Sequence, residues 1–214
     1  LVYATKLYKK ETIEKIAEHY INILNEIAEN SNEKIKDISM LTDSDKQDIF
    51  KKFNNSKAEY PKDKTLQDLF EEQVTKVSNN IALIYENEKI TYQELNEKTN
   101  KLARYLRKNG VDREKIVGIM TTRYIDMVVG ILGILKAGGA YMPIDPSYPE
   151  ERKRYMLEDS KAGVLLVQDS NGLDELFDGK IININDNEIN NESSLNLDIE
   201  RSSRDLAYII YTSG

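Results

Sequence analysis

The chain has no cysteine and no tryptophan, and only one histidine among its 214 residues. The absence of cysteine excludes disulfide bonds, thiolate catalysis and thiolate metal sites, and it is compatible with a reducing cytoplasm. The one histidine, His19, cannot form a multi-histidine metal site, and its place in an amphipathic pattern predicts a surface or boundary residue. We therefore expect neither a metal site nor thiol chemistry from these side chains.

Long hydrophobic runs are lacking too. The longest, residues 127–135, has about half the length of a membrane-spanning helix, and the start of the chain has no signal-peptide pattern, so we expect no passage through a membrane.

The net charge of −7 falls within residues 169–205, where ten acidic residues accompany three basic ones. Because the remainder is neutral, we expect no nucleic-acid-binding surface. The hydrophobic content of 40% is enough for a globular core.

The first 60 residues show two separate patterns. A short apolar start is followed, over residues 11–29, by apolar residues at spacings of three and four, which predicts one long amphipathic helix. One helix cannot bury a core of its own, so we expect residues 1–40 to be the end of an upstream domain. Thr42 predicts the cap of another helix, and the polar stretch before Pro61 indicates a linker over residues 41–60.

From residue 61 onward, strands and helices alternate regularly. Thr65 is the expected cap of one helix, and Thr91 with Glu94 forms a capping box for the next, which ends at Gly110. The expected strands cover residues 81–85, 89–91, 116–120, 140–144, 162–168 and 180–184, with further helices over 124–137 and from Pro149. The predicted fold class is therefore α/β, a mainly parallel sheet covered by helices and preceded by an α-helical tail and linker. The Asn-, Asp- and Ser-rich residues 185–203 are predicted to be a solvated connection.

Three glycines and a lysine lie close together in residues 132–140, a composition that also occurs in nucleotide-binding loops. Gly133 lies inside a predicted helix, and Gly138 and Gly139 follow its end, which favours packing and helix termination over phosphate contact. Lys136 is a candidate catalytic lysine. A lysine near a helix C-terminus also complements the helix dipole, and we favour that structural role.

Residues 206–214 are the most informative stretch. An apolar run ends there in Thr212, Ser213 and Gly214, which predicts a buried strand that brings a loop to the carboxyl edge of the sheet. Hydroxyl donors and a glycine suit a phosphate-binding loop, although an ordinary turn after a strand explains the same residues. Such a loop needs more consecutive backbone N–H groups than these residues provide, so we expect the chain to be cut inside a nucleotide site.

Three motifs in this order resemble the adenylation domains of nonribosomal peptide synthetases. Residues 90–96, ITYQELN, resemble the first core motif of that family, residues 135–145, LKAGGAYMPID, the second, and residues 206–214, LAYIIYTSG, the start of the third. The likeness covers about residues 60–214, and the preceding tail is similar to the C-terminal end of a condensation domain. The resemblance implies three parts. Residues 1–40 would be the condensation end, residues 41–60 an interdomain linker, and residues 61–214 the N-terminal part of an adenylation domain.

The resemblance also implies a function. The parent enzyme would activate an amino acid with ATP and Mg²⁺ to an aminoacyl adenylate, and transfer it to a phosphopantetheine thiol on a downstream carrier domain. Thr212, Ser213 and Gly214 would bind the ATP phosphates, and no catalytic role carries over to a residue of this chain. Because the rest of the site is absent, we expect the chain itself to be inactive.

Two other functions remain open at this stage. The chain could belong to a fatty-acyl or aryl-acid ligase that forms adenylates in the same way, or it could serve as a non-catalytic platform that joins an upstream condensation domain to the adenylation core. We further expect the isolated chain to self-associate, because a strand over residues 206–211 would carry large apolar side chains on both faces.

Overall fold

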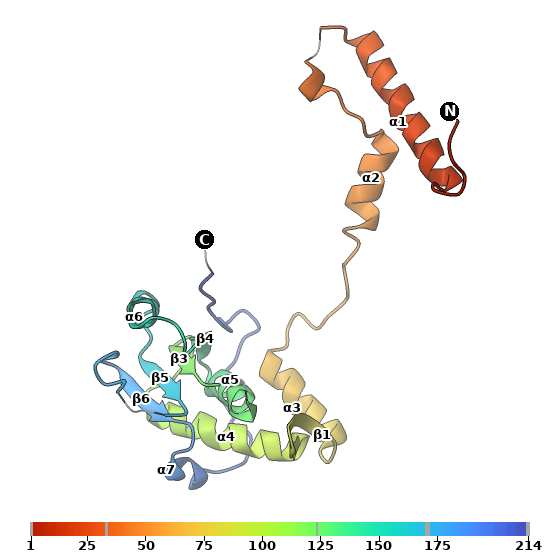
Figure 1. Ribbon diagram of the computed structural model, residues 1–214. Coiled ribbons are helices and arrows are strands. Elements are labelled where there is room, and N and C mark those ends of the chain that lie inside the picture. Colours follow the sequence, from red (N-terminus) through yellow and green to blue (C-terminus); the bar gives the residue numbers. More distant parts are fainter. Residues whose placement is uncertain (1, 33, 123, 170–171, 213–214) are drawn as a thin grey trace. The chain divides into compact units, whose positions relative to one another are not determined.

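The structure is a computed structural model, and it describes residues 2–32, 34–122, 124–169 and 172–212. The chain divides into two compact units, Leu1–Tyr60 and Pro61–Gly214 (Figure 1). Among the described residues, no helix combines the length and the apolar character that crossing a membrane requires.

The two α-helices of the first unit are connected through the buried side chain of Asp45. Helix α1 (Lys10–Glu29) is the predicted amphipathic helix, and the 3₁₀ helix η1 (Ile35–Asp37) and helix α2 (Asp43–Lys52) follow it. Thr42 and Asp45 form a capping box at the start of α2. The carboxylate of Asp45 also lies 2.6 Å from Lys15 Nζ and 3.1 Å from His19 Nε2 on α1. The hydrogen bond from Lys15 contributes most to holding the pKa of Asp45 below its ordinary value.

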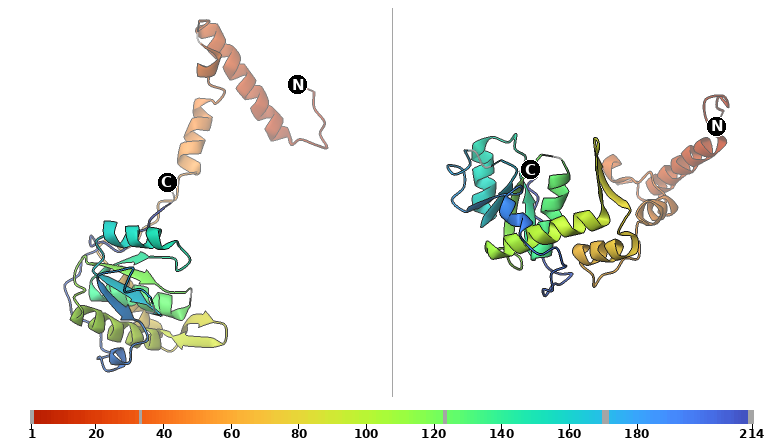
Figure 2. Two further views of the ribbon diagram at one scale, coloured as in Figure 1. Left: turned by 60° about the vertical axis from the view of Figure 1, so that its left-hand side comes forward. Right: turned by 90° about the horizontal axis from the view of Figure 1, so that it is seen from below.

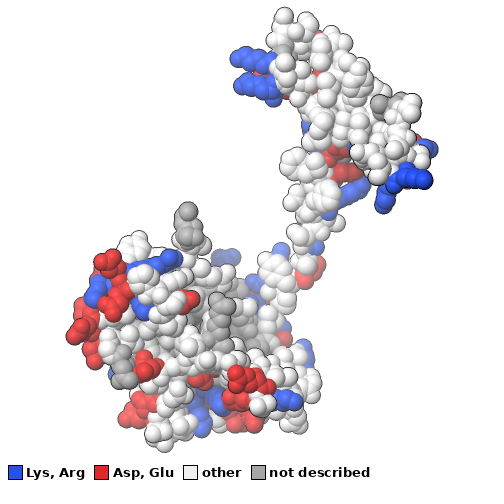
Figure 3. Space-filling model, in the orientation of Figure 1, with Lys and Arg blue, Asp and Glu red and all other residues white. Residues whose placement is uncertain are grey.

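The apolar stripe of α1 is largely uncovered within this unit. No residue of α1 is buried, and large apolar side chains of the helix are exposed, namely those of Ile16, Tyr20, Ile21, Leu24 and Ile27. Figure 3 shows that most of the visible surface of the unit carries no charge. The expectation that this helix does not bury a core of its own is confirmed. His19 is a boundary residue as predicted, since its side chain is 20% exposed.

The second unit is built on the predicted parallel sheet. Its strands are β3 (Ile116–Met120), β4 (Ala140–Pro143), β5 (Val164–Val167) and β6 (Lys180–Asn183), in the order β4-β3-β5-β6. All three neighbouring pairs are parallel. Helices α4 and α5 cover one face and α6 the other, so that the sheet lies between two helical layers (Figure 2). The predicted α/β class is confirmed.

Capping hydrogen bonds and a glycine set the ends of several helices in this unit. Thr65 with Asp68 and Thr91 with Glu94 form capping boxes that start α3 (Leu66–Val77) and α4 (Tyr92–Lys108). The remaining elements of this unit are the antiparallel strands β1 (Ile81–Tyr85) and β2 (Glu88–Thr91), and helices α5 (Ile125–Ala137), α6 (Glu150–Asp159) and α7 (Asn187–Asn190). Helix α5 ends at Gly138, whose φ of +94° is the left-handed conformation that glycine adopts at little cost.

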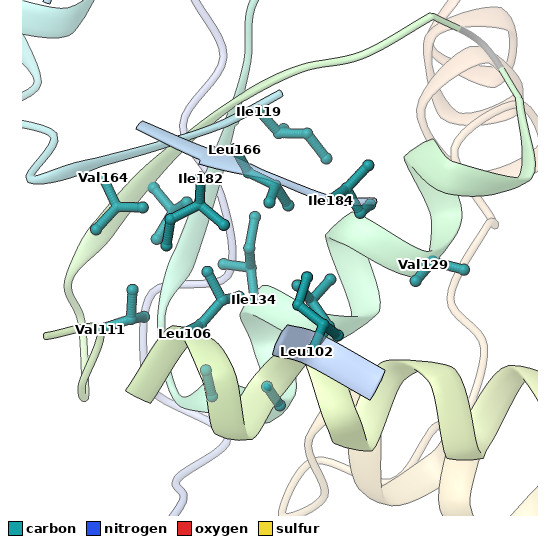
Figure 4. Close-up of a cluster of buried hydrophobic side chains, with 14 of the residues drawn as sticks. Leu102, Leu106, Val111, Ile119, Val129, Ile134, Val164, Leu166, Ile182 and Ile184 are labelled. Carbon is teal, nitrogen blue, oxygen red and sulfur yellow. The ribbon is translucent and has the colours of Figure 1, made fainter. Parts of the chain in front are cut away.

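The main core lies between α4, α5 and the sheet (Figure 4). Each residue of α5 is buried or half-buried, which confirms the expectation drawn from its apolar character on all sides. Ile134 on this helix is fully buried, and Leu102 and Leu106 reach it from α4. Gly133 allows α4 and α5 to approach closely, because a Cβ atom at this position would lie 2.6 Å from Leu102 Cδ2.

We predict that Gly133→Ala lowers the free energy of unfolding by about 1–3 kcal/mol, because the added methyl group overpacks the α4–α5 contact. Gly163→Ala is the matched control: a Cβ there meets no heavy atom within 4 Å among the described residues. Urea denaturation of both variants gives the comparison. Equal stability of the two variants would show that α4 and α5 do not meet at Gly133.

One prediction about this unit is wrong. Residues 185–203 are more than a solvated connection: they contain α7, and the side chains of Ile189 and Leu197 are only 7% exposed. The segment packs on α4, where Asn100 Nδ2 donates to Ser194 O at 2.8 Å. The polar composition of this segment therefore does not indicate exposure to solvent. A few of its apolar side chains are buried, and its backbone carbonyl groups accept hydrogen bonds from side chains of α4.

Candidate functional site

The predicted phosphate-binding segment lies beside the outer edge of β4. Tyr141 of β4 donates its backbone N–H to Ala207 O at 3.1 Å and accepts from Ile209 N at 3.0 Å, which forms a parallel bridge to Tyr208. The rings of Tyr141 and Tyr208 are 5.5 Å apart. The segment therefore continues the parallel sheet by one short bridge, in the direction that the sequence predicts.

The prediction of a buried strand over this segment is wrong. Only an isolated bridge forms, and Leu206, Tyr208 and Ile210 are 42–57% exposed. The alternate residues Ile209 and Tyr211 pack against the core on the α6 side of the sheet. The segment lies at the edge of the described sheet. It therefore pairs with β4 alone, and only one of its faces packs against the core. Its exposed apolar face agrees with the premise of self-association, which itself stays a prediction.

Of the three predicted site residues, Thr212 alone lies within the described part of the chain, and it is exposed. Ser213 and Gly214 lie outside the described residues. Parallel strands present their carboxyl ends at one edge of a sheet, where ligands are commonly bound, and Thr212 follows a segment that runs parallel to β4. The assignment of the three residues to phosphate binding stays a prediction.

A cavity of about 460 Å³ opens next to this segment. It lies at the carboxyl ends of β3 and β4, and hydroxyl and carboxylate side chains join apolar ones in its lining, among them those of Thr121, Thr122, Asp145, Ser147 and Tyr211. Asp145 Oδ1 accepts from Ser147 N at 2.9 Å and from Ser147 Oγ at 2.7 Å, which confirms that Asp145 caps the turn after β4. The volume is in the range of small-molecule sites.

The two ends of the segment are held by side chains. At its start, Arg113 Nη2 lies 2.6 Å from Asp205 Oδ1, and Asp205 Oδ2 accepts from Ser202 N at 2.9 Å. The hydrogen bond from Arg113 lowers the pKa of Asp205. At its far end, Tyr211 Oη donates to Asp159 Oδ2 at 2.6 Å. Burial, assisted by this carboxylate, raises the pKa of Tyr211 to about 12, so the hydroxyl stays protonated at neutral pH.

Lys136 lies away from this edge, in a polar network inside the core. Its side chain is fully buried, and Nζ donates to Asn96 Oδ1 at 2.5 Å and to Asn100 Oδ1 at 2.6 Å. Nζ also lies 3.1 Å from Glu71 Oε1 and 5.3 Å from the centre of the Phe70 ring. Burial lowers the pKa of Lys136 to about 8, although Glu71 favours the charged form.

This network fixes the direction of two amide groups. A lysine amine only donates hydrogen bonds, so both asparagine oxygens must face Lys136. The two Nδ2 groups then point toward the segment after α7, where each lies 2.9 Å from Asn196 Oδ1. These contacts support the structural role that we favour for Lys136. It lies in the last turn of α5, as expected, and its direct partners are side chains of α3 and α4.

The glycines of residues 132–140 do not form a phosphate-binding loop. Gly133 packs against Leu102, and Gly138 ends α5. This confirms the expectation that they serve packing and helix termination. Among the described residues, no group of three or more His, Asp or Glu side chains is placed to hold a metal ion.

Two family models match the chain. Residues 70–214 match the model of the AMP-binding enzymes, and residues 1–50 match that of the condensation domain. The chain belongs to the AMP-binding enzyme family. Its N-terminal helices correspond to the C-terminal end of a condensation domain.

The relatives are large synthetases. The chain is 50% identical over 215 residues to gramicidin S synthase 2 of Brevibacillus brevis, a match that covers 100% of this chain and 5% of the relative. It is 46% identical over 212 residues to bacitracin synthase 2 of Bacillus licheniformis, which covers 99% of this chain and 8% of that protein. The chain thus spans only 5–8% of the length of these two curated relatives.

A solved structure supports the same assignment. The AMPPNP-bound form of the nonribosomal peptide synthetase FmoA3 superposes with a TM-score of 0.72 at 26% identity, over 96% of this chain and 22% of that chain. The chain is therefore a segment of a nonribosomal peptide synthetase, in which the end of a condensation domain precedes the N-terminal part of an adenylation domain.

Proposed function

We propose that the complete synthetase carrying this segment activates an amino acid with ATP. The amino-acid carboxylate attacks the α-phosphate, an aminoacyl adenylate forms, and pyrophosphate leaves. The acyl group then passes to a phosphopantetheine thiol on a downstream carrier domain, with release of AMP. The observation that carries the proposal is the match of residues 70–214 to the AMP-binding enzymes, and the AMPPNP complex of the related FmoA3 supports ATP as the substrate.

Within this reaction we assign Thr212, Ser213 and Gly214 to the ATP phosphates. These residues end the segment that is bridged in parallel to β4 at Tyr208. Hydroxyl and backbone donors at such a position stabilise the charge that develops as pyrophosphate leaves. The exposed hydroxyl of Thr212 can meet a ligand without disturbing the core, since the side chain is not buried.

Mg²⁺ would enter this site with the nucleotide. Protein-bound Mg²⁺ typically keeps several waters and is held by substrate phosphates together with one or two carboxylates. We assign no residue of this chain as a metal ligand.

The remaining partners follow from the order of domains. We expect the rest of the condensation domain, whose family model matches residues 1–50, upstream in the same polypeptide. The exposed apolar stripe of α1 favours an additional docking role for residues 1–60, in which the body of that domain covers the stripe. The absence of cysteine agrees with a cytoplasmic enzyme.

We predict that Thr212→Ala and Ser213→Ala, made singly in the complete synthetase, each lower kcat/KM for adenylation about 10- to 100-fold. The reason is that a hydrogen bond to a charged group contributes about 1.5–3 kcal/mol. Thr75→Ala is the matched control, since this exposed threonine lies on α3 and its hydroxyl donates to Glu71 O. Unchanged adenylation kinetics in both folded variants would refute the phosphate assignment.

A further inference from the structure

Backbone pairing of residues 206–212 stops before the segment reaches Thr212. Ile209 N donates to Tyr141 O, and no backbone hydrogen bond of Ile210, Tyr211 or Thr212 is found within the described residues. The course of the chain just before Thr212 is therefore set by side chains. Tyr211 is the side chain that connects this stretch to another element, namely α6.

The contact between Tyr211 and α6 has two parts. The hydroxyl donates to Asp159 Oδ2 at 2.6 Å, a short bond of the kind that neutral donors form with a charged carboxylate. The ring of Tyr211 also meets the ring of Tyr155 edge-on, with their centres 6.1 Å apart. Helix α6 is a firm support, since Met156 and Leu157 are each only 2% exposed.

The position of Asp159 is unfavourable for the helix itself. It is the last residue of α6, and the last turn contains no basic side chain. A carboxylate at a helix C-terminus faces the negative end of the helix dipole, which disfavours it by a modest amount. A residue that opposes its own helix and also makes a short hydrogen bond to a candidate site is typical of a functional role.

We propose that Asp159 is a positioning residue for adenylation, which holds Tyr211 and thereby sets the direction in which Thr212 approaches the ATP phosphates. The inference rests on the proposed function, and it adds a residue from outside the three motifs that carried the resemblance. We expect no contact between Asp159 and the nucleotide. It acts through Tyr211.

The test uses the complete synthetase and amino-acid-dependent exchange of labelled pyrophosphate into ATP. Tyr211→Phe and Asp159→Ala are each expected to raise KM for ATP about 3- to 10-fold, with a smaller change in kcat. This is less than the full contribution of a hydrogen bond to a charged group, because the bond acts on the nucleotide only through Thr212. The double variant should be no worse than either single variant, because both remove the same contact. Asp159→Asn keeps an acceptor and should recover part of the loss.

The matched control is Tyr105→Phe. It makes the same change on α4, where the hydroxyl donates to Asp186 Oδ2 at 3.2 Å and not to α6. We expect its KM for ATP to equal that of the unmodified enzyme, and melting temperatures should confirm that all variants are folded.

The outcomes separate this inference from the proposed function. An active unmodified enzyme whose KM for ATP is unchanged by Tyr211→Phe and Asp159→Ala would overturn the positioning role alone. Additive effects of the two substitutions would overturn it as well, because the residues would then act independently. An unmodified enzyme without exchange activity for any amino acid would refute the proposed function, and the positioning role with it.

Discussion

Lys136→Met is expected to lower the free energy of unfolding of the chain by about 3–5 kcal/mol, as is typical when one partner of a buried polar network is removed. Methionine fills a similar volume but donates no hydrogen bond. Asn96 Oδ1 and Asn100 Oδ1 would lose the donor that faces them in the core. Glu71 would keep Arg201, 3.5 Å away, as its remaining charged partner.

Urea denaturation at neutral pH measures this effect. Lys76→Met is the control, since Lys76 is an exposed lysine in the last turn of α3, and its loss should change stability by less than about 0.5 kcal/mol. Equal stability of the two variants would mean that the network around Lys136 contributes little.

The unmodified chain and Lys136→Met should also differ in how their stability depends on pH. Burial lowers the pKa of Lys136 from 10.5 to about 8 in the folded chain. Between these values the unfolded chain holds a proton that the folded chain has lost, so raising the pH favours the folded state. We expect the stability difference between the unmodified chain and Lys136→Met to grow across this window, by at most about 1.4 kcal/mol per pH unit. A difference that stays constant or shrinks would contradict the buried environment of this amine.

Ile134→Asp is expected to prevent folding of the second unit. Ile134 is fully buried between α5, α4 and the sheet (Figure 4), so an aspartate there would place an unpaired carboxylate in the core. The cost exceeds about 4 kcal/mol, a large part of the stability of an ordinary domain. Circular dichroism and thermal melting provide the measurement.

The control for this substitution is Ile84→Asp. Ile84 is 64% exposed on β1, and a carboxylate there remains in water. This variant should fold and melt cooperatively. A soluble Ile134→Asp protein with a cooperative transition would show that α5 is not central to the core.

The secondary structure was largely predictable from local signals. The capping boxes at Thr65 and Thr91 and the glycine at Gly138 fix three helix ends through short-range hydrogen bonds and backbone conformation, which the sequence shows directly. Strands buried on both faces have apolar residues throughout, so the parallel sheet was also predictable. Local signals did not predict burial that depends on tertiary packing. Residues 206–211 have the composition of a buried strand, but they lie at an edge of the sheet and are covered on one face only.

The candidate site was predictable only as a stretch of sequence. The motif that ends in Thr212 indicated phosphate binding, but nothing local shows that Tyr211 meets Asp159, which is 52 residues away. The network around Lys136 likewise joins α3, α4 and α5. Its one signal in the sequence is the pair Asn96 and Asn100, two amides four residues apart on the buried face of a helix whose other buried residues are apolar except for Thr99.

We propose above that this chain belongs to an enzyme that forms aminoacyl adenylates. The most direct measurement is exchange of labelled pyrophosphate into ATP by the complete synthetase, with the amino acids, aryl acids and fatty acids supplied one at a time. We expect exchange that depends on an amino acid and is lost without Mg²⁺. Exchange with aryl or fatty acids alone, or no exchange with any amino acid by the folded enzyme, would contradict it.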